Sequence, residues 1–378
     1  MRNRILISPN SFKECADSVT IAELIRDNLI NLKETKLIIK PISDGGDGFL
    51  NVCKFHFGGD LIKYTISTAF DNSKFECPVL YCKKRMEIYV ESAEVLGLKI
   101  VPLFYRNPLK LTSKGMGELL MQIEADVHSL KLKVNRVYIG IGGTATIDMG
   151  MGMISVLGLK LIDSKDDELD VIPKNFQLTQ RIDYKPVKFS FELMPIVDVK
   201  NPLLGPNGGI RTFGKQKKAN DKTISTLEEG FSHLLNIFEN NEFKFYSNVL
   251  SGAGGGIPVA FQIFYKTSLL NSSEFIGSNL GLWKYSTKVD YLITGEGAFD
   301  SQSNLGKGAG ALIDLFKEKV QRLFLLCGRI NKEVISCLPK NVYPLEMRRY
   351  FSNEKESIEG YKKGIRQACK EIVKRLNF

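Results

Sequence analysis

The chain has little histidine and no paired cysteine motif. Three of its 378 residues are histidines, at positions 56, 128 and 233, and its seven cysteines are scattered with no C-x-x-C spacing. The sequence therefore offers almost no candidate ligands for a zinc site and almost no candidate histidines for a catalytic triad. An odd number of scattered cysteines in a long chain is typical of reduced, buried thiols. We expect the chemistry to depend on carboxylates, lysine, arginine, hydroxyl groups and the backbone.

A long apolar run is also absent from the sequence. No stretch approaches the roughly 20 residues that cross a bilayer. The first apolar run, residues 5–8, is too short for a signal peptide and is followed directly by Pro9. We therefore expect a cytoplasmic protein with no membrane partner.

Positive charge exceeds negative charge, with 52 Lys and Arg against 42 Asp and Glu and a formal net charge of +10. Such an excess suits an anionic partner. The sequence shows no RNA-recognition motif, helix-turn-helix or zinc finger to accompany the charge. We therefore expect small anionic substrates and no nucleic acid as partners, and the pattern indicates no particular oligomeric state.

Apolar runs, glycine turns and helical patterns alternate along the chain. Residues 5–8 precede a helical pattern at 18–32, and residues 137–141 precede a glycine turn and the apolar segment 151–159. Residues 289–294 run into a further glycine turn at Gly295-Glu296-Gly297. This alternation predicts parallel α/β units.

Other segments depart from that alternation. Residues 75–81 and 86–90 are rich in β-formers and predict a hairpin, while the polar stretches 164–175 and 215–222 predict surface loops. Residues 354–378 have apolar positions at helical spacing and predict an amphipathic helix capped by Ser352 or Asn353.

Glycines gather in five clusters, four of which carry a carboxylate within a few residues. The clusters lie at 44–48, 140–144, 205–209, 252–256 and 295–297, and the acids are Asp44 and Asp47, Asp148, Asp198, and Glu296 with Asp300. Glycine turns bring backbone N–H groups close to an anion, and carboxylates beside them suit a magnesium–phosphate site. Taken one at a time, such clusters also occur as tight βα turns with helix-capping acids.

Two segments resemble nucleotide-binding motifs. Gly140-x-Gly142-x-x-Ala145 follows a predicted strand and opens a predicted helix, and Asp163 follows some 20 residues on, as in a dinucleotide fingerprint. A nicotinamide-dependent oxidoreductase that binds NAD(P) through residues 140–145 is therefore the alternative function. Residues 301–308 resemble a Walker A loop but lack its first glycine and its final Ser or Thr, which excludes a P-loop ATPase by motif.

Eight blocks, in order from about residue 5 to residue 330, resemble bacterial-type (type 1) glycerate kinases. Pro9-Asn10-Ser11-Phe12-Lys13-Glu14 is similar to P-D-S-F-K-E/G, and Asp44-Gly45-Gly46-Asp47-Gly48 to D-G-G-E-G. The remaining blocks are 106–118 (R-N-P-x-x-x-T-S-x-G-x-G-E), 141–148 (I-G-G-S-A-T-N-D), 198–206 (D-V-x-N-P-L-x-G-P), 213–217 (F-G-P-Q-K), 252–256 (G-A-A-G-G) and 294–303 (T-G-E-G-x-x-D-x-Q-S).

The resemblance implies two unlike α/β domains with the active site in the cleft between them, one of them flavodoxin-like with a parallel sheet. We place residues 1–65 together with 285–378 in the flavodoxin-like lobe and residues 66–284 in the second. The implied reaction is ATP- and Mg²⁺-dependent phosphoryl transfer to a hydroxyl of D-glycerate, or of a close small hydroxy acid, giving a phosphoglycerate.

The resemblance also implies roles for single residues. Asp198 is the first candidate to orient or deprotonate the attacking hydroxyl, with Asp44 second and Lys13 as a further catalytic candidate. Candidates for the other roles are Ser11, Phe12, Arg106 and Asn201 for substrate, Gly142, Gly143, Thr144, Gly295, Gly297 and Lys307 for phosphate or nucleotide, and Glu296 with Asp300 for the metal.

The chain departs from the family pattern at several positions. Asn10 stands in place of Asp, Ile147 in place of Asn, Met149 in place of Gly, Lys215 in place of Pro and Ala298 in place of Arg. A lost cation at position 298 matters most, because one cation can contribute orders of magnitude to phosphoryl transfer. A catalytically weakened or non-catalytic, anion-sensing relative is therefore a further alternative.

Overall fold

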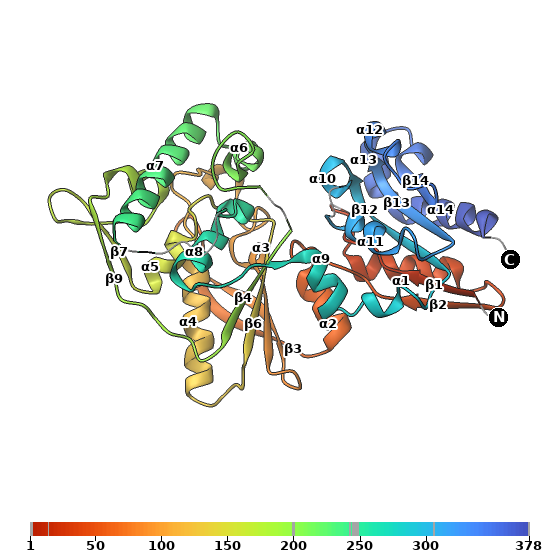
Figure 1. Ribbon diagram of the computed structural model, residues 1–378, viewed down its shortest axis with the longest axis horizontal. Helices are drawn as coiled ribbons and strands as arrows, with labels where there is room; N and C mark the ends of the chain where they lie inside the picture. The colour runs from red at the N-terminus through yellow and green to blue at the C-terminus, as the bar shows by residue number, and fades with distance from the viewer. Residues whose placement is uncertain are drawn as a thin grey trace. The chain divides into compact units, whose positions relative to one another are not determined.

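The computed structural model describes residues 3–13, 15–198, 201–241, 243, 249–304 and 307–376. The chain divides into two compact units, whose residue ranges can be followed along the colour bar of Figure 1. Unit 1 comprises Met1–Gly58 and Asn271–Phe378, and unit 2 comprises Gly59–Leu270. Both divisions fall earlier in the chain than residues 65 and 284, where the sequence analysis set them.

Unit 1 is built on a five-stranded sheet in the order β14-β13-β12-β1-β2. Every neighbouring pair is parallel. The strands are β1 (Asn3–Ile7), β2 (Thr35–Ile39), β12 (Tyr291–Phe299), β13 (Arg322–Ile330) and β14 (Val342–Glu346). Numbered within the unit, this order is 5-4-3-1-2, the doubly wound arrangement of flavodoxin-like folds. The predicted fold class of this unit is therefore confirmed.

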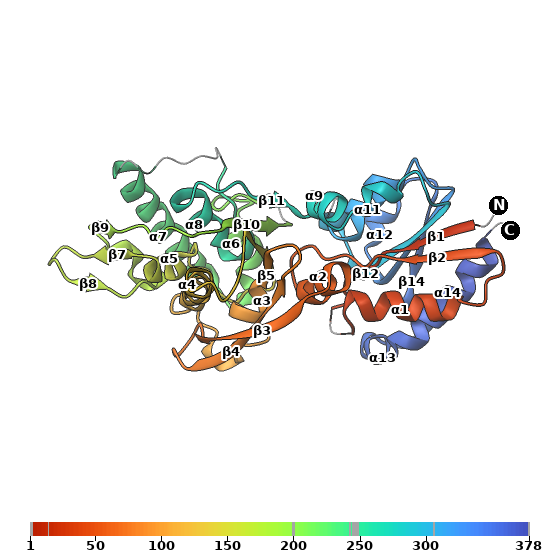
Figure 2. The same ribbon diagram turned by 90° about the horizontal axis from the view of Figure 1, so that it is seen from below.

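Helices cover both faces of this sheet, as Figure 2 shows. The helices α1 (Ser18–Leu29) and α14 (Tyr361–Arg375) contribute to one core with β1, β12 and β13, while α11 (Ala309–Phe316) packs on β12 and β13. Covered faces explain why the last three residues of β1, Ile5-Leu6-Ile7, form a continuous buried apolar run. The other helices of unit 1 are α2 (Phe49–Phe57), α9 (Ser272–Glu274), α10 (Ser301–Asn304), α12 (Lys332–Ile335) and α13 (Glu354–Glu359).

The C-terminal amphipathic segment forms two helices where one was predicted. Asn353 caps the first of them, its Oδ1 accepting from the Glu356 N–H at 2.9 Å, as expected. The break falls at Gly360, where a Cβ would lie 2.5 Å from the Phe351 ring. The close approach of that ring accounts for glycine at this position.

The glycine turn predicted at residues 295–297 is wrong. β12 continues through it to Phe299 and stays paired with β13, with Gly295 opposite Leu326 and Glu296 opposite Cys327. A Cβ on Gly295 would lie 1.6 Å from the Leu326 carbonyl oxygen. Gly295 is therefore required by the close contact between strands, which a turn prediction based on glycine content does not anticipate.

Unit 2 contains a six-stranded sheet in the order β11-β10-β6-β5-β4-β3. β10, β6 and β5 are parallel, whereas β5, β4 and β3 are antiparallel neighbours, which confirms the predicted hairpin. The strands are β3 (Asp60–Ser67), β4 (Lys74–Cys82), β5 (Glu87–Glu91), β6 (Arg136–Ile141), β10 (Glu192–Val197) and β11 (Leu270–Asn271). A separate antiparallel sheet, β8-β7-β9, is made of β7 (Leu159–Ile162), β8 (Glu168–Leu169) and β9 (Arg181–Tyr184).

The helices of unit 2 share one apolar core with the six-stranded sheet. They are α3 (Ser92–Leu96), α4 (Lys114–His128), α5 (Met151–Val156), α6 (Gly209–Phe213), α7 (Asp221–Asn240) and α8 (Ile257–Phe264). Short 3₁₀ helices occur in both units: η1 (Leu103–Tyr105), η2 (Pro173–Leu178), η3 (Lys215–Lys217), η4 (Ala253–Gly255), η6 (Trp283–Tyr285) and η7 (Met347–Tyr350). The segment η5 (Phe275–Asn279) is a short π-helix. No helix in the described part of the chain is long and apolar enough to span a membrane.

The two predicted surface loops are only partly loops. Residues 164–175 contain β8 and the start of η2. Residues 215–222 contain η3 and the start of α7, and Lys217 is buried with 4% of its surface exposed. Tertiary packing therefore overrides the local polarity at Lys217.

Candidate functional site

In unit 1, the predicted site residues Asp44 and Asp300 lie at the carboxyl edge of the parallel sheet together with Asn10, which stands in place of the family's Asp. Asn10 follows β1, Asp44 follows β2 and Asp300 follows β12. β1 lies between β2 and β12, so the chain connections leave it in opposite directions and the edge beside β1 is a topological switch point. Ligands bind at such a point in open α/β sheets.

Asn10 makes hydrogen bonds to residues on both sides of β1: to Asp44, which follows β2, and to Gly295 in β12. Its Nδ2 donates to Asp44 Oδ2 at 3.3 Å, and its backbone N–H donates to the Gly295 carbonyl at 2.8 Å. A Cβ on Gly308 would lie 3.0 Å from Asn10 Nδ2 and 2.5 Å from Glu296 Oε2. Asn10, Asp44 and Glu296 therefore form one polar cluster. Gly308, at φ +52°, has no side chain and so leaves space for this cluster.

Other predicted residues of unit 1 lie in mixed environments. Ser11 is half-buried and Lys13 is exposed, so both are accessible to a ligand. Phe12 is only 1% exposed and packs in the core of unit 1. Its ring therefore stabilises the loop instead of facing a ligand.

Asp300 and Lys307 lie at helix starts. Asp300 Oδ1 accepts from the Ser303 N–H at 3.2 Å at the start of α10, which is a capping contact. Lys307 is half-buried and precedes Gly308 and α11. Of the matched blocks, Glu14, Val199 and Lys200 lie outside the described residues, as does Gly306 just before Lys307.

In unit 2, the carboxyl ends of three adjacent parallel strands bring together Ser92, Gly142 and Asp198. Ser92 follows β5, Gly142 follows β6, and Asp198 follows β10. Ser92 Oγ accepts from the Gly142 N–H at 3.0 Å and donates to the Gly142 carbonyl at 2.9 Å. Ser92 thus positions the loop after β6, a role that no sequence motif indicated.

The loop at residues 142–148, called the 142–148 loop, has several backbone N–H groups without an acceptor. Gly142 N–H is taken by Ser92, and Ala145 N–H donates to the Leu96 carbonyl at 2.7 Å. Within the described residues, the other N–H groups of the loop, from Gly143, Thr144, Thr146, Ile147 and Asp148, make no hydrogen bond. Of these residues only Gly143 is exposed, and it is left-handed, with φ +65°. The N–H groups of Gly143 and its neighbour Thr144 are therefore the donors of the loop that an anion could use.

Asp148 anchors the far end of the 142–148 loop. It is fully buried and accepts from the Ser113 N–H and Oγ, both at 2.7 Å, from the Gly150 N–H at 3.1 Å and from the Gly152 N–H at 3.2 Å. Burial raises the pKa of Asp148 above its ordinary value, against the opposing effect of these donors. Asp148 therefore ties the loop to the starts of α4 and α5.

Lys217 reaches the same loop from η3. Its Nζ donates to Thr144 Oγ1 at 3.1 Å and to the Thr146 carbonyl at 2.9 Å. Burial lowers the pKa of Lys217 to about 7, and the nearby Asp148 carboxylate only partly offsets that effect. The sequence placed Lys217 in a surface loop, so its contact with the predicted phosphate loop was missed.

Two predicted substrate residues already bind backbone or neighbouring side chains. The guanidinium of Arg106 donates to the carbonyls of Val101, at 3.0 Å, and Leu98. Asn201 Nδ2 donates to the Asn207 carbonyl at 2.8 Å and to Thr212 Oγ1 at 3.2 Å. Both side chains therefore stabilise local loops, and any contact with substrate would use their remaining atoms.

The dinucleotide fingerprint at residues 140–145 lacks its structural context. The expected helix does not open at Gly142, because a loop follows β6 and α5 begins only at Met151. The next strand, β7, pairs antiparallel with β8 and β9 and not with β6. Since a Rossmann site requires a βαβ unit whose helix starts at the glycines, the NAD(P) alternative is not favoured.

The unit 1 cluster matches the ligand preference of Mg²⁺. No group of three or more His, Cys, Asp or Glu side chains is arranged to hold a metal ion among the described residues. Mg²⁺ normally takes one or two protein carboxylates and completes its shell with water and phosphate oxygens. Asp44 and Glu296, with the amide of Asn10 beside them, supply a donor set of that kind.

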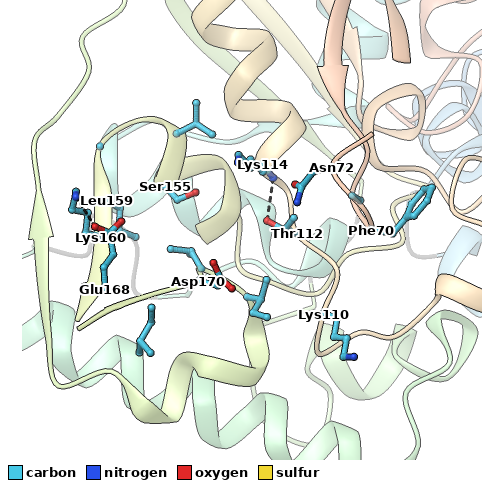
Figure 3. Close-up of a pocket in the computed structure, with 16 residues that line it drawn as sticks. Phe70, Asn72, Lys110, Thr112, Lys114, Ser155, Leu159, Lys160, Glu168 and Asp170 are labelled. Carbon is cyan, nitrogen blue, oxygen red and sulfur yellow. Dashed lines mark hydrogen bonds and ion pairs between the residues drawn. The ribbon is translucent and has the colours of Figure 1, made fainter. Parts of the chain in front are cut away.

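A cavity of about 500 Å³ lies elsewhere in unit 2, between α4, α5 and the β7–β8 hairpin (Figure 3). Lys160 on its wall pairs with Glu168 at 2.6 Å, and Lys114 N–H donates to Thr112 Oγ1 at 3.3 Å. None of its lining residues is a predicted site residue. We therefore do not place the reaction in this cavity.

Comparison with known proteins agrees with the sequence blocks. A model of the glycerate kinase family matches residues 5–377. The glycerate 2-kinase of Escherichia coli K12 is 29% identical over 336 residues, covering 88% of this chain and 86% of the relative. The glycerate kinase of Bacillus subtilis 168 is 30% identical over 311 residues, covering 80% and 79%.

A solved structure shows the same fold. A crystal structure of a protein assigned as glycerate kinase 2 from Salmonella typhimurium LT2 has a TM-score of 0.76 and 23% identity, covering 99% of this chain and 98% of that one. The match extends over both α/β units. The chain therefore belongs to the glycerate kinase family and is an enzyme, a phosphotransferase with an alcohol group as acceptor.

Proposed function

We propose that this enzyme transfers the γ-phosphoryl group of ATP to a hydroxyl of D-glycerate, giving a phosphoglycerate, with Mg²⁺ as the cofactor. The observation that carries the proposal is the placement of carboxylate and glycine blocks of the family at the carboxyl ends of parallel strands in both units. Phosphoryl transfer depends mainly on positioning and on neutralising charge. Anion-binding N–H groups and carboxylates at these edges are suited to that task.

In unit 2, Asp198 is the proposed base. It follows β10 directly and is half-buried, next to the strand that carries the 142–148 loop. A carboxylate in that position can accept the proton of the attacking glycerate hydroxyl. The N–H groups of Gly143 and Thr144 are the proposed donors to phosphate oxygens, and Gly142 supports them through Ser92.

In unit 1, Asp44 and Glu296 are the proposed metal ligands. When bound there, Mg²⁺ would neutralise the charge of the phosphate oxygens. Asn10 holds Asp44 through its amide. Asp300 is a further candidate, and its Oδ1 also caps α10.

The remaining roles concern the two anions. Lys13 and Ser11 are accessible and are proposed to hold the glycerate carboxylate, with the unused atoms of Arg106 and Asn201 as further donors in unit 2. Lys307 is proposed to contact phosphate. Gly295 and Gly297 would act by allowing the close β12 contacts that place Glu296.

A coupled assay of ADP formation tests the proposal. With D-glycerate and Mg²⁺ we expect sustained ATP consumption, and with EDTA or without hydroxy acid we expect none. A panel of small hydroxy acids would show whether the substrate is glycerate or a close analogue. Thermal stabilisation by ATP and glycerate without turnover would identify the chain as a non-catalytic relative and contradict the proposal.

A further inference from the structure

Lys217 is a buried lysine that the proposed chemistry does not use directly. It extends from η3, and its Nζ donates to Thr144 Oγ1 and to the Thr146 carbonyl, on the 142–148 loop. Its surface is 4% exposed, so the nitrogen is removed from bulk water. A lysine is rarely buried to this degree unless its nitrogen has specific partners.

The loop is held tightly on its other sides. A Cβ on Gly255 would lie 2.0 Å from the Thr146 carbonyl oxygen, and the Met149 N–H donates to the Gly255 carbonyl at 3.2 Å. Asp148 closes the end of the loop through its contacts with Ser113, Gly150 and Gly152. Among the described residues, Lys217 alone hydrogen-bonds the side chain of Thr144.

Gly143 and Thr144 are neighbours in the 142–148 loop, and neither N–H group makes a hydrogen bond in the described residues. The peptide between them is held by the Leu98 N–H, which donates to the Gly143 carbonyl at 3.0 Å, and the Ala145 N–H donates to the Leu96 carbonyl at 2.7 Å on the following side. Lys217 adds the contact to the side chain of Thr144, which completes the positioning of this peptide pair.

We infer that Lys217 is a positioning residue for nucleotide binding: through Thr144 it sets the direction of the Gly143 and Thr144 N–H groups toward the phosphates of ATP. The inference rests on the proposed function, because it takes those groups as phosphate donors. Lys217 itself does not contact the nucleotide in this account. It acts through the loop, in the way that outer partners orient the groups that touch a ligand.

The test is a double-mutant cycle on ATP binding. Lys217→Met keeps the length and volume of the side chain but removes the donors, and Thr144→Val removes the hydroxyl that accepts. We expect each variant to raise the Kd for ATP·Mg²⁺, measured by isothermal titration calorimetry, by about tenfold. The double variant should bind about as weakly as either single one, because both changes break the same contact.

The readouts separate positioning from stability. In turnover assays, Lys217→Met should raise KM for ATP more than KM for glycerate, and the Kd should be raised in samples shown to be folded by circular dichroism. Lys222→Met, a change at an exposed lysine of α7 nearby in the chain, should leave both KM values unchanged. An unchanged Kd in folded Lys217→Met, or multiplicative effects in the double variant, would overturn the inference.

Failure of the proposed function has a different signature. If the wild-type chain binds ATP·Mg²⁺ but does not phosphorylate glycerate, the proposed reaction is wrong and the binding cycle still decides the role of Lys217. If the wild-type chain phosphorylates glycerate and Lys217→Met keeps its ATP affinity, the reaction stands and the role of Lys217 is wrong.

Discussion

Asp198 and Asp44 are both carboxylates at strand ends, but their surroundings differ. Asp44 has both oxygens engaged in the described structure, with Gly46 N–H donating to Oδ1 at 3.0 Å and Asn10 donating to Oδ2 at 3.3 Å. Asp198 follows the parallel strand next to β6, beside the proposed phosphate loop. These surroundings favour Asp44 as a fixed metal ligand and Asp198 as the group that moves a proton.

Replacement of Asp198 tests that assignment. Asp198→Asn keeps the shape but cannot accept the proton, so kcat should fall by at least about 100-fold while KM for ATP changes little. Steady-state kinetics measure both constants. Asp44→Asn is the matched variant, and it should instead raise the Mg²⁺ concentration needed for half-maximal rate by about tenfold. Near-normal turnover of Asp198→Asn would remove Asp198 from the role of base.

The burial of Lys217 also predicts a pH dependence of stability. The pKa of Lys217 is about 7 in the folded chain, against an ordinary value of 10.5. Between these values the unfolded chain binds the extra proton, so this group makes the free energy of unfolding rise with pH, by up to about 1.4 kcal/mol per pH unit. Below pH 7 the full free-energy cost of burying the charged Lys217 side chain is present.

Chemical denaturation at several pH values between 7 and 10 measures this contribution. Lys217→Met should remove that part of the slope, since methionine does not titrate, whereas the exposed Lys222→Met should retain it. The same slope in Lys217→Met and wild type would mean that Lys217 is not buried as described.

At the scale of elements, β12 contains two glycines whose surroundings differ. Gly295 and Gly297 both lie in β12, but a Cβ on Gly295 would lie only 1.6 Å from the Leu326 carbonyl oxygen of the neighbouring strand. A Cβ on Gly297 would first meet the Lys13 backbone nitrogen at 3.1 Å. A side chain at Gly295 would therefore disturb the packing of the sheet more than one at Gly297.

Alanine at each position gives a matched pair of variants. Gly295→Ala should lower the free energy of unfolding by more than about 3 kcal/mol, because β12 and β13 must separate to admit the methyl group. Gly297→Ala should cost about 1 kcal/mol or less, since the loop at Lys13 can shift slightly. Thermal and denaturant unfolding compare them, and equal losses would contradict the strand contact at Gly295.

Ala298 and Arg329 are a second pair of interest in the same two strands. They lie opposite each other in the parallel register of β12 and β13, and both are exposed. Within the described residues Arg329 has no ion pair. The family pattern has arginine at position 298, so Arg329 is in a position to supply the cation that this chain lacks there.

The elements show what sequence patterns can and cannot predict. Apolar runs and glycine turns correctly indicated parallel strands, because strands covered on both faces read as continuous apolar segments. The extension of β12 through Gly295 and the burial of Lys217 could not be predicted, since each depends on a neighbour that is distant in sequence. The hydrogen bonds of Arg106 to backbone carbonyls depend on loop packing in the same way.

At the scale of the whole molecule, the two units differ in chain continuity. Unit 2 is one uninterrupted segment with its own core, whereas unit 1 is assembled from both ends of the chain. A contiguous segment with an independent core is expected to fold alone. Residues 59–270 expressed alone should therefore show a cooperative thermal transition by circular dichroism. A non-cooperative melt would show that unit 2 depends on unit 1.

The flavodoxin-like order of unit 1 and the family membership came from the resemblance and not from periodicity. Alternating strands and helices are compatible with many sheet orders, and the order is fixed by contacts between strands near opposite ends of the chain, such as β1 with β12. For the site, the resemblance pointed to Asp44 and Asp198, which lie at strand ends, and it marked Asn10 as a departure from the family pattern. It did not distinguish the exposed Lys13 from the core residue Phe12 beside it.

The central claim is the transfer of phosphate from ATP to glycerate. Phosphorus NMR of the purified chain with ATP, Mg²⁺ and D-glycerate follows that transfer directly, because a phosphomonoester of glycerate is resolved from ATP, ADP and inorganic phosphate. The account predicts that the ATP γ-phosphorus signal declines as a phosphoglycerate signal grows in equal amount. Release of inorganic phosphate alone, or an unchanged ATP spectrum at high enzyme concentration, would contradict it.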